Sequence, residues 1–467
     1  MVKLATVVVY SALSGIASGG RQQPFRHDSD AEQVPPLSGT QALEAWMQQQ
    51  DEFAQRQILR NIAPILDDPS AMRGAVCASP SRAHPNYYYA WTRDSALVMN
   101  ELVEWLSANP GNGTFVDEIE RHLDDYIAFT RHVQSLPKLA YGLGEAKFHM
   151  DGSRFRGSWC NPQTDGPAIR ARTVMRYLAH TSDAQRTRRV FDQVVAADLD
   201  YVVDMWRHTG GCDIWEEARG RHFYTLLAQH RALLEGAEMA HNLGETRRAQ
   251  RYARAAQQIH AHFDKFWDPE RGYIVATRNA TGGIKSKRSN LDAQVLLAVL
   301  HHGDARLLSS SKVVATVAEL VRVFGALYKV NRVQRTRIHG WWVPLGAAAG
   351  RYPEDVYNGD GTSRGNPWSL VTSALAEYHY RLARELAVAG GAGGPGLAEY
   401  LLGVGDRYMA RVCRHTDGDH TMYEQWSRRS GFGRGAVHLT WSYAAHMSAT
   451  RARRVLAREM ALSAELM

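Results

Sequence analysis

Repeated amphipathic segments are the feature of this sequence that most constrains its fold. Eleven stretches place apolar side chains three and four positions apart, the spacing of one face of an α-helix. They cover residues 40–62, 93–107, 115–136, 194–209, 223–244, 245–267, 291–302, 312–328, 367–388, 396–413 and 439–463. Convincing strand patterns are few, so we expect an all-α fold with about twelve helices.

Long loops rich in glycine, proline, tryptophan and charge separate these segments. They span residues 78–94, 140–168, 209–222, 336–367 and 415–438. Long loops in a compact domain are usually functional. They recur after about every second helix, as in a closed barrel of paired helices whose connections build a site at one end. No linker interrupts the pattern, so we expect a single catalytic domain over residues 41–467.

The N-terminus has the pattern of a secretory signal peptide. Lys3 precedes an apolar stretch from Leu4 to about Ala17, and small residues follow, so we expect a signal over residues 1–19 and a polar arm over 20–40. The predicted location is extracellular, with a vacuole as the alternative. Asn112 and Asn279 begin glycosylation sequons. The four cysteines, Cys77, Cys160, Cys212 and Cys413, form no CxxC pair, and their disulfide pairing stays open.

Charge and motifs exclude several classes of function. The net charge is +7, but the arginines are spread along the chain and mixed with acids, so nucleic-acid binding is not expected. Beyond the N-terminus no stretch is long and apolar enough for a membrane helix. No Walker loop, HExxH or dinucleotide turn is present. We therefore expect no cofactor, metal or membrane partner, and a monomer.

Five loop segments mix tryptophan or tyrosine with arginine, aspartate or glutamate. They are NYYYAWTRDSALV (86–98), the stretch 142–171, GCDIWEEARGRHF (211–223), AGRYPEDVYNGDGTSRGNPWSL (349–370) and MYEQWSRRSGFGRGAVHLTWSYAA (422–445). Aromatic rings stack on the apolar faces of sugars, and the polar groups hydrogen-bond their hydroxyls. Together the segments indicate a carbohydrate site.

The same segments resemble a known family. WTRDS, LGEAKF, PQTDGPAIRA, DIWEE, RYPEDVY with GNPW, and LTWSYAA look like the glucoamylases of glycoside hydrolase family fifteen, and the RYPEDVYNG form looks closest to the yeast-type members. The resemblance implies an (α/α)6 barrel of six inner and six outer helices. It also implies inverting exo-hydrolysis of α-1,4 bonds, and more slowly α-1,6 bonds, at the non-reducing ends of starch, dextrins and maltooligosaccharides. The expected product is β-D-glucose, and no starch-binding domain is expected.

Two glutamates are the predicted catalytic pair. Hydrolysing a glycoside needs one carboxyl that protonates the leaving oxygen and a second that activates water. The resemblance assigns the first role to Glu216 of DIWEE and the second to Glu424 of YEQW.

The resemblance also assigns sugar-binding residues. Arg93 and Asp94 would clamp the hydroxyls of the terminal glucose, and Glu217 would bind on the leaving-group side. The full predicted set is Tyr87, Trp91, Arg93, Asp94, Trp159, Trp215, Glu217, Arg351, Asp355, Trp368 and Trp441. Three places depart from the family. Cys160-Asn161 stands where Gly-Arg is usual, which removes an arginine near the acid. Gly435 stands where some relatives carry serine, and His438 stands where an acidic or amide residue is common.

Two alternatives stay open at this level. A related specificity on the same barrel, such as a trehalase or glucodextranase, would use the same terminal-glucose site. A barrel of this type can also be a non-catalytic glycan-binding or regulatory module.

Overall fold

The computed structural model describes residues 36–465, apart from residues 66, 110, 112, 138, 389–393 and 417. The predicted signal peptide, most of the predicted arm and the sequon residue Asn112 lie outside the described residues. The first described helix, α2 (Pro36–Arg60), begins four residues before the first predicted helical stretch.

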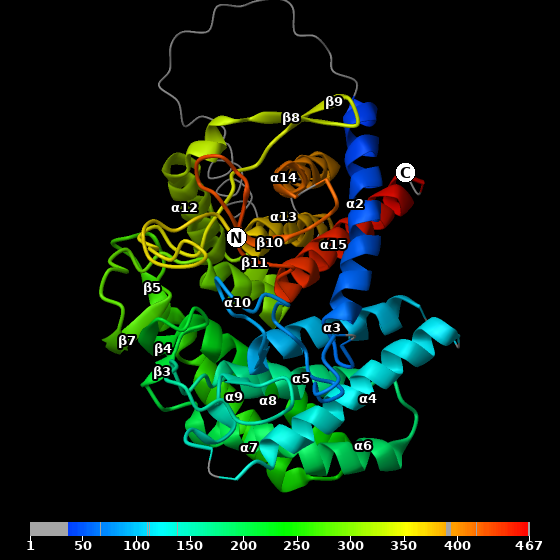
Figure 1. The fold of residues 1–467 in the computed structure, drawn as a ribbon, viewed down its shortest axis with the longest axis vertical. Helices are drawn as coiled ribbons and strands as arrows, with labels where there is room; N and C mark the ends of the chain where they lie inside the picture. Colours follow the sequence, from blue (N-terminus) through cyan, green and yellow to red (C-terminus); the bar gives the residue numbers. More distant parts are fainter. Residues whose placement is uncertain are drawn as a thin grey trace, which may run out of the picture.

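Helices that pack side by side form an inner ring in the described part of the chain (Figure 1). Each packs against the next, and the last packs back against the first. The ring runs through α3 (Thr92–Ala108), α5 (Asp165–Leu178), α8 (Phe223–Asn242), α10 (Gln294–His302), α13 (Ser369–Val388) and α15 (Thr440–Glu465). This closed order defines a barrel.

A second set of helices surrounds the ring. It comprises α2, α4 (Thr114–Gln134), α7 (Ala196–Met205), α9 (Thr246–His260), α12 (Ser311–Leu327) and α14 (Gly394–His415). Each packs on a ring helix, and outer and inner helices alternate along the chain. The predicted (α/α)6 barrel is therefore confirmed.

Burial separates the two layers of helices. The inner α5 buries twelve of its fourteen residues, whereas the outer α9 buries five of fifteen. The sequence predicts no helix over α5 and assigns residues 165–171 to a loop segment. The reason is that α5 begins with Asp165-Gly166-Pro167, residue types that are common in turns, and carries three arginines among its apolar positions.

Short elements fill the connections. Small helices are η1 (Gly142–Gly144), α6 (Ala184–Val190), η2 (Phe191–Val195), η3 (Phe263–Phe266), α11 (Ala305–Leu308) and η4 (Lys329–Arg332). Antiparallel strands pair as β1 (Ala90–Trp91) with β2 (Lys147–Phe148), β5 (Trp267–Asp268) with β6 (Tyr273–Ile274), β8 (Arg335–Ile338) with β9 (Trp341–Pro344), and β10 (Tyr423–Trp426) with β11 (Gly433–Val437). A three-stranded sheet joins β3 (Gly211–Cys212), β4 (Ala218–His222) and β7 (Thr277–Gly283) in that order.

Among the described residues, no helix combines the length and the apolar character needed to cross a membrane. Over the same residues, no group of three or more histidine, cysteine, aspartate or glutamate side chains could hold a metal ion.

Candidate active site

The predicted site residues lie in the connections that lead into the inner helices or in the first turns of those helices. Trp91 directly precedes α3, Glu216 lies before α8, and Glu424 lies before α15. Because an outer helix returns the chain between successive inner helices, the inner helices run in the same direction. Their N-termini, and the loops that precede them, therefore meet at one end of the barrel.

Glu216 occupies a turn between β3 and β4. Its backbone has φ +66°, a left-handed conformation that is uncommon for a residue with a side chain. Two bonds support the turn: the amide of Glu216 donates to the carbonyl of Asp213 (3.0 Å), and the amide of Glu217 donates to Asp213 Oδ1 (2.9 Å). One carboxylate oxygen of Glu216 accepts two hydrogen bonds, from Trp91 Nε1 (2.7 Å) and Gln163 Nε2 (2.8 Å).

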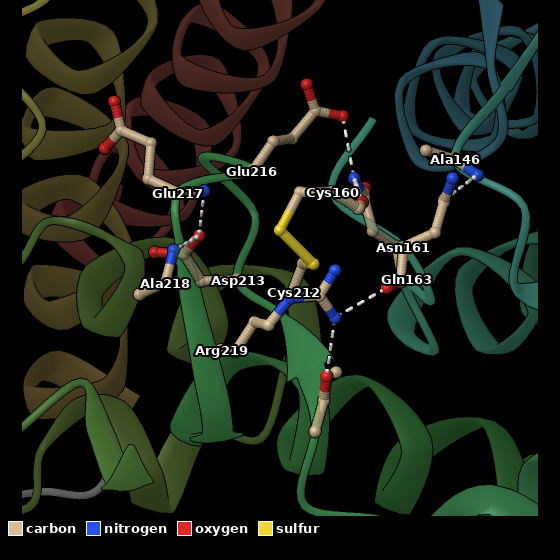
Figure 2. The surroundings of a disulfide bond; sticks show 12 residues. Ala146, Cys160, Asn161, Gln163, Cys212, Asp213, Glu216, Glu217, Ala218 and Arg219 are labelled. Carbon is tan, nitrogen blue, oxygen red and sulfur yellow. Dashed lines mark hydrogen bonds between the residues drawn. A yellow bond between two sulfur atoms is a disulfide. The ribbon is translucent and has the colours of Figure 1, made fainter. Parts of the chain in front are cut away.

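A disulfide joins the loop of Gln163 to the strand that precedes the turn of Glu216. Cys160, in the loop that carries Gln163, is bonded to Cys212 of β3, as Figure 2 shows. In the same place Arg219 of β4 donates to the carbonyl of Asn161 (2.7 Å). The arginine that the family usually has at position 161 is thus absent, but an arginine from a neighbouring strand and a covalent bond hold this loop. Cys77 and Cys413 are free thiols.

Glu424 of β10 is fully buried. It accepts hydrogen bonds from the hydroxyl of Tyr87 (2.9 Å), from the hydroxyl of Tyr357 (3.2 Å) and from the amide of Ala436 (3.3 Å). Burial raises the pKa of Glu424 to about 7, although these hydrogen bonds act in the opposite direction.

One short stretch, residues 87–91, donates a hydrogen bond to each of the two glutamates. Tyr87 bonds Glu424 and Trp91 bonds Glu216, and the two rings are in contact, with centroids 5.4 Å apart. The two carboxylates, 208 positions apart in sequence, therefore face one shared aromatic wall.

Arg93 and Asp94 carry polar atoms that the protein leaves unbonded. The Arg93 guanidinium is buried and donates to Gln163 (2.9 Å) and Asp165 (3.2 Å). Its Nε lies 3.4 Å from Asp94 Oδ2, yet both atoms are buried and neither has a hydrogen-bond partner among the described groups. Burial raises the pKa of Asp94 to about 6, against the effect of Arg93. Asp94 is 16% exposed and Arg93 is 4% exposed, so Asp94 is the member of this pair that a ligand could reach.

Arg351 organises a second cluster. It forms a bidentate pair with Asp355 (2.6 and 2.8 Å) and donates to Glu217 (2.7 Å). Tyr352 donates to the other oxygen of Glu217 (2.5 Å). The side chain of Arg351 is 4% exposed and that of Glu217 is 20% exposed, so Glu217 is the member of this cluster within reach of a ligand.

The predicted tryptophans fall into two groups. Trp215 and Trp368 contact each other (5.6 Å) and flank the Arg351 guanidinium, while Trp159 contacts Trp91 (6.0 Å). Trp441 begins α15, and its ring contact is with His301 (6.2 Å). Trp215 and Trp368 therefore lie beside the Arg351 cluster that holds Glu217, and Trp159 lies beside Trp91, which bonds Glu216. The place of Trp441 in the site stays a prediction.

Four further residues contact the predicted site residues, although the sequence does not predict them as site residues. Gln163 and Tyr357 bond the two glutamates directly, and Asp213 and Tyr352 hold Glu217. The one sequence feature that could have identified these four residues is their position within the motifs PQTDG, DIWEE and RYPEDVY. Residue type alone does not separate them from ordinary loop residues.

A barrel that gathers two carboxylates, aromatic rings and unbonded polar groups at one end has the design of a carbohydrate-cleaving hydrolase. The sequence matches the model of glycosyl hydrolases family 15 over residues 52–451. It is 34% identical over 453 residues to glucoamylase 1 of Rhizopus oryzae, covering 89% of this chain and 72% of that protein. It is 32% identical to a probable glucoamylase of Schizosaccharomyces pombe, covering 87% and 91%.

The fold gives the same result. A solved glucoamylase of Saccharomycopsis fibuligera superposes with a TM-score of 0.80 at 28% identity, covering 89% of this chain and 96% of that one. The chain belongs to glycosyl hydrolase family 15. The enzyme class that the motifs predict, a glycoside hydrolase of the glucan 1,4-α-glucosidase type, is confirmed, and the non-catalytic barrel is set aside.

Proposed function

We propose that this enzyme is an inverting glucoamylase that removes single glucose units from the non-reducing ends of starch, dextrins and maltooligosaccharides. It acts on α-1,4 bonds and more slowly on α-1,6 bonds, and it releases β-D-glucose. It works as a secreted monomer, without a metal or cofactor.

In the proposed mechanism Glu216 protonates the leaving glycosidic oxygen, and Glu424 deprotonates the water that attacks the opposite face of the sugar. The observation that carries this assignment is the Tyr87–Trp91 wall, which bonds Glu424 at one end and Glu216 at the other. A glucose ring held against this wall would have one carboxylate on each side of its anomeric carbon.

The groups around the pair fit a terminal glucose and the sugar that follows it. Asp94, the more exposed member of the Arg93–Asp94 pair, would bind hydroxyls of the terminal unit, and Arg93 would hold its carboxylate in place. Glu217, fixed by Arg351, would receive the leaving-group sugar. Trp159, Trp215 and Trp368 would supply apolar surface for both rings.

The test is proton NMR of the anomeric region while the enzyme digests maltoheptaose. We expect β-glucose first, with no short dextrins formed by internal cleavage. Early α-glucose would overturn inversion, and short dextrins would overturn exo-action. Maltose, isomaltose and trehalose, assayed separately, would show whether another linkage is preferred.

Variants assign the roles. Glu216→Gln and Glu424→Gln should each lower kcat by roughly 10²–10⁴-fold, the contribution of one general acid or base. Glu270→Gln, an exposed carboxyl in the turn between β5 and β6, is the control and should keep wild-type activity. A Glu216 or Glu424 variant with wild-type kcat would refute the assignment.

A further inference from the structure

A buried ammonium group lies beneath the turn that carries Glu216. Lys287 belongs to the connection between β7 and α10, outside every motif that marks the site. Its side chain is 5% exposed, and its Nζ lies 3.1 Å from Asp213 Oδ2 and in direct contact with Asp292 Oδ2. Both aspartates are fully buried.

The two aspartates hold the residues on either side of the acid. Asp213 Oδ1 accepts the amides of Glu217 (2.9 Å) and Ala218 (3.1 Å). Asp292 Oδ1 accepts the indole N–H of Trp215 (2.8 Å). The residue before Glu216 and the two residues after it are thus anchored to carboxylates that share one lysine.

A third contact links Lys287 to Glu217 through Tyr352. The ring of Tyr352 lies 4.5 Å from Lys287 Nζ, and the Tyr352 hydroxyl donates to Glu217 Oε2. A buried carboxylate without a counter-charge is strongly disfavoured and takes up a proton instead. Burial alone would raise the pKa of Asp213, but the Lys287 ammonium, His222 and the amides of Glu217 and Ala218 together outweigh burial and lower that pKa to about 2.

We propose that Lys287 is a positioning residue for the general acid: its ammonium group pairs with Asp213 and Asp292 and holds them in place, and they in turn fix the left-handed turn of Glu216. The lysine touches no reacting atom and acts through the two aspartates. The inference rests on the proposed role of Glu216. A neutral Asp213 would accept the two amides less strongly, and the strained turn would relax.

The test compares three variants of the full chain. Lys287→Met keeps the approximate volume and removes the charge, Lys287→Arg keeps the charge, and Lys285→Met removes an exposed charge two residues away in the same connection. With maltotriose as the substrate, we expect Lys287→Met to lower kcat at least tenfold with KM changed less than threefold. Lys287→Arg should recover part of the loss, and Lys285→Met should match the wild type.

Hydrogen exchange gives a readout that does not depend on activity. Amides of residues 213–218 should exchange several-fold faster in Lys287→Met than in Lys285→Met, while amides of α12 keep their protection. If the wild type cleaves no glucan, the proposed function fails, and the exchange data still decide whether Lys287 holds the turn.

Two results would overturn the inference. One is a folded Lys287→Met protein with kcat within twofold of the wild type, even if its thermal stability is lower. The other is unchanged exchange in residues 213–218. If Lys287→Met does not fold, Asp292→Asn takes its place, because the amide oxygen can still accept from Trp215 while the ion pair is lost. In that variant, too, unchanged kcat and exchange would overturn the proposal.

Discussion

At the scale of single residues, the proposed mechanism makes the ionisation of Glu424 set how activity depends on pH. Its buried position raises its pKa to about 7, and the hydrogen bond from Tyr87 acts against this rise. A general base must be ionised, so kcat/KM should fall about tenfold per pH unit below that pKa. Tyr87→Phe removes a bond that favours the ionised form and should move this acid limb to higher pH.

The measurement is kcat/KM on maltose from pH 4 to 9. Tyr88→Phe is the matched control, because the Tyr88 hydroxyl donates to Asp68 instead of a catalytic glutamate. An acid limb that stays in place in Tyr87→Phe would show that Tyr87 does not tune Glu424. A rate that falls as the pH rises through 7, with a midpoint that moves in Tyr87→Phe, would instead give Glu424 the role of the acid.

Gly435 shows how closely the backbone approaches the base. A Cβ at this position would lie 2.1 Å from Glu424 Oε2, and the residue has φ +72°. Gly435→Ala should therefore displace the carboxylate and lower kcat on the order of 10²-fold, as expected for a catalytic group misplaced by about 1 Å. Gly361→Ala, where a Cβ meets no atom within 4 Å, should keep wild-type kcat in the same assay. Equal activity of the two variants would contradict this account.

At the scale of elements, the Cys160–Cys212 disulfide links the loop before α5 to the strand before the acid. It joins residues 52 positions apart, and closing a loop of this length stabilises the folded state by about 4 kcal/mol in the chain-entropy model. The double variant Cys160→Ser/Cys212→Ser should lose a large part of that free energy of unfolding. Urea denaturation followed by tryptophan fluorescence measures the loss.

Cys413→Ser is the control for this experiment, since it removes a free thiol. It should change the free energy of unfolding by much less than the double variant. A double variant with an unchanged urea midpoint and slope would show that Arg219 and the local hydrogen bonds hold the loop without the covalent bond.

At the scale of the whole molecule, apolar periodicity predicted the outer helices well, because each has one solvent-exposed face and one buried face. The same reasoning could not find α5, since its Asp-Gly-Pro start is typical of a turn and three arginines interrupt its apolar positions. The order of the motifs placed Glu216 and Glu424 in site-forming loops. Their approach depends on ring closure, which brings α15 back against α3 and which no local pattern contains.

The contacts that hold the loop and the turn around Glu216 were the least predictable part of the site. Asn161 predicted a weaker setting for the acid, but Arg219 comes from a different strand and the disulfide partner lies 52 residues away. The left-handed backbone of Glu216 also has no sequence signal, because glutamate carries no preference for that conformation. Contacts between separate segments decide each of these features.

Closure of the barrel leads to a last prediction, on stability. Asp51 of the outer helix α2 accepts a hydrogen bond from Thr450 (2.8 Å) and pairs with Arg454, both on α15 (Figure 1). Asp51 is buried, so Asp51→Ala leaves its partners without their acceptor and should cost about 2–3 kcal/mol. In a barrel of this size that loss lowers Tm by on the order of 2–4 °C.

Calorimetry measures this Tm, with Glu52→Ala, an exposed neighbour on the same helix, as the control. At 20 °C both variants should hydrolyse maltotriose at the wild-type rate, because α2 contributes no group to the site. A loss of kcat in Asp51→Ala below its unfolding range would mean that the contact between α2 and α15 also positions the loop of Glu424. Closure of the barrel and assembly of the site would then be one cooperative event.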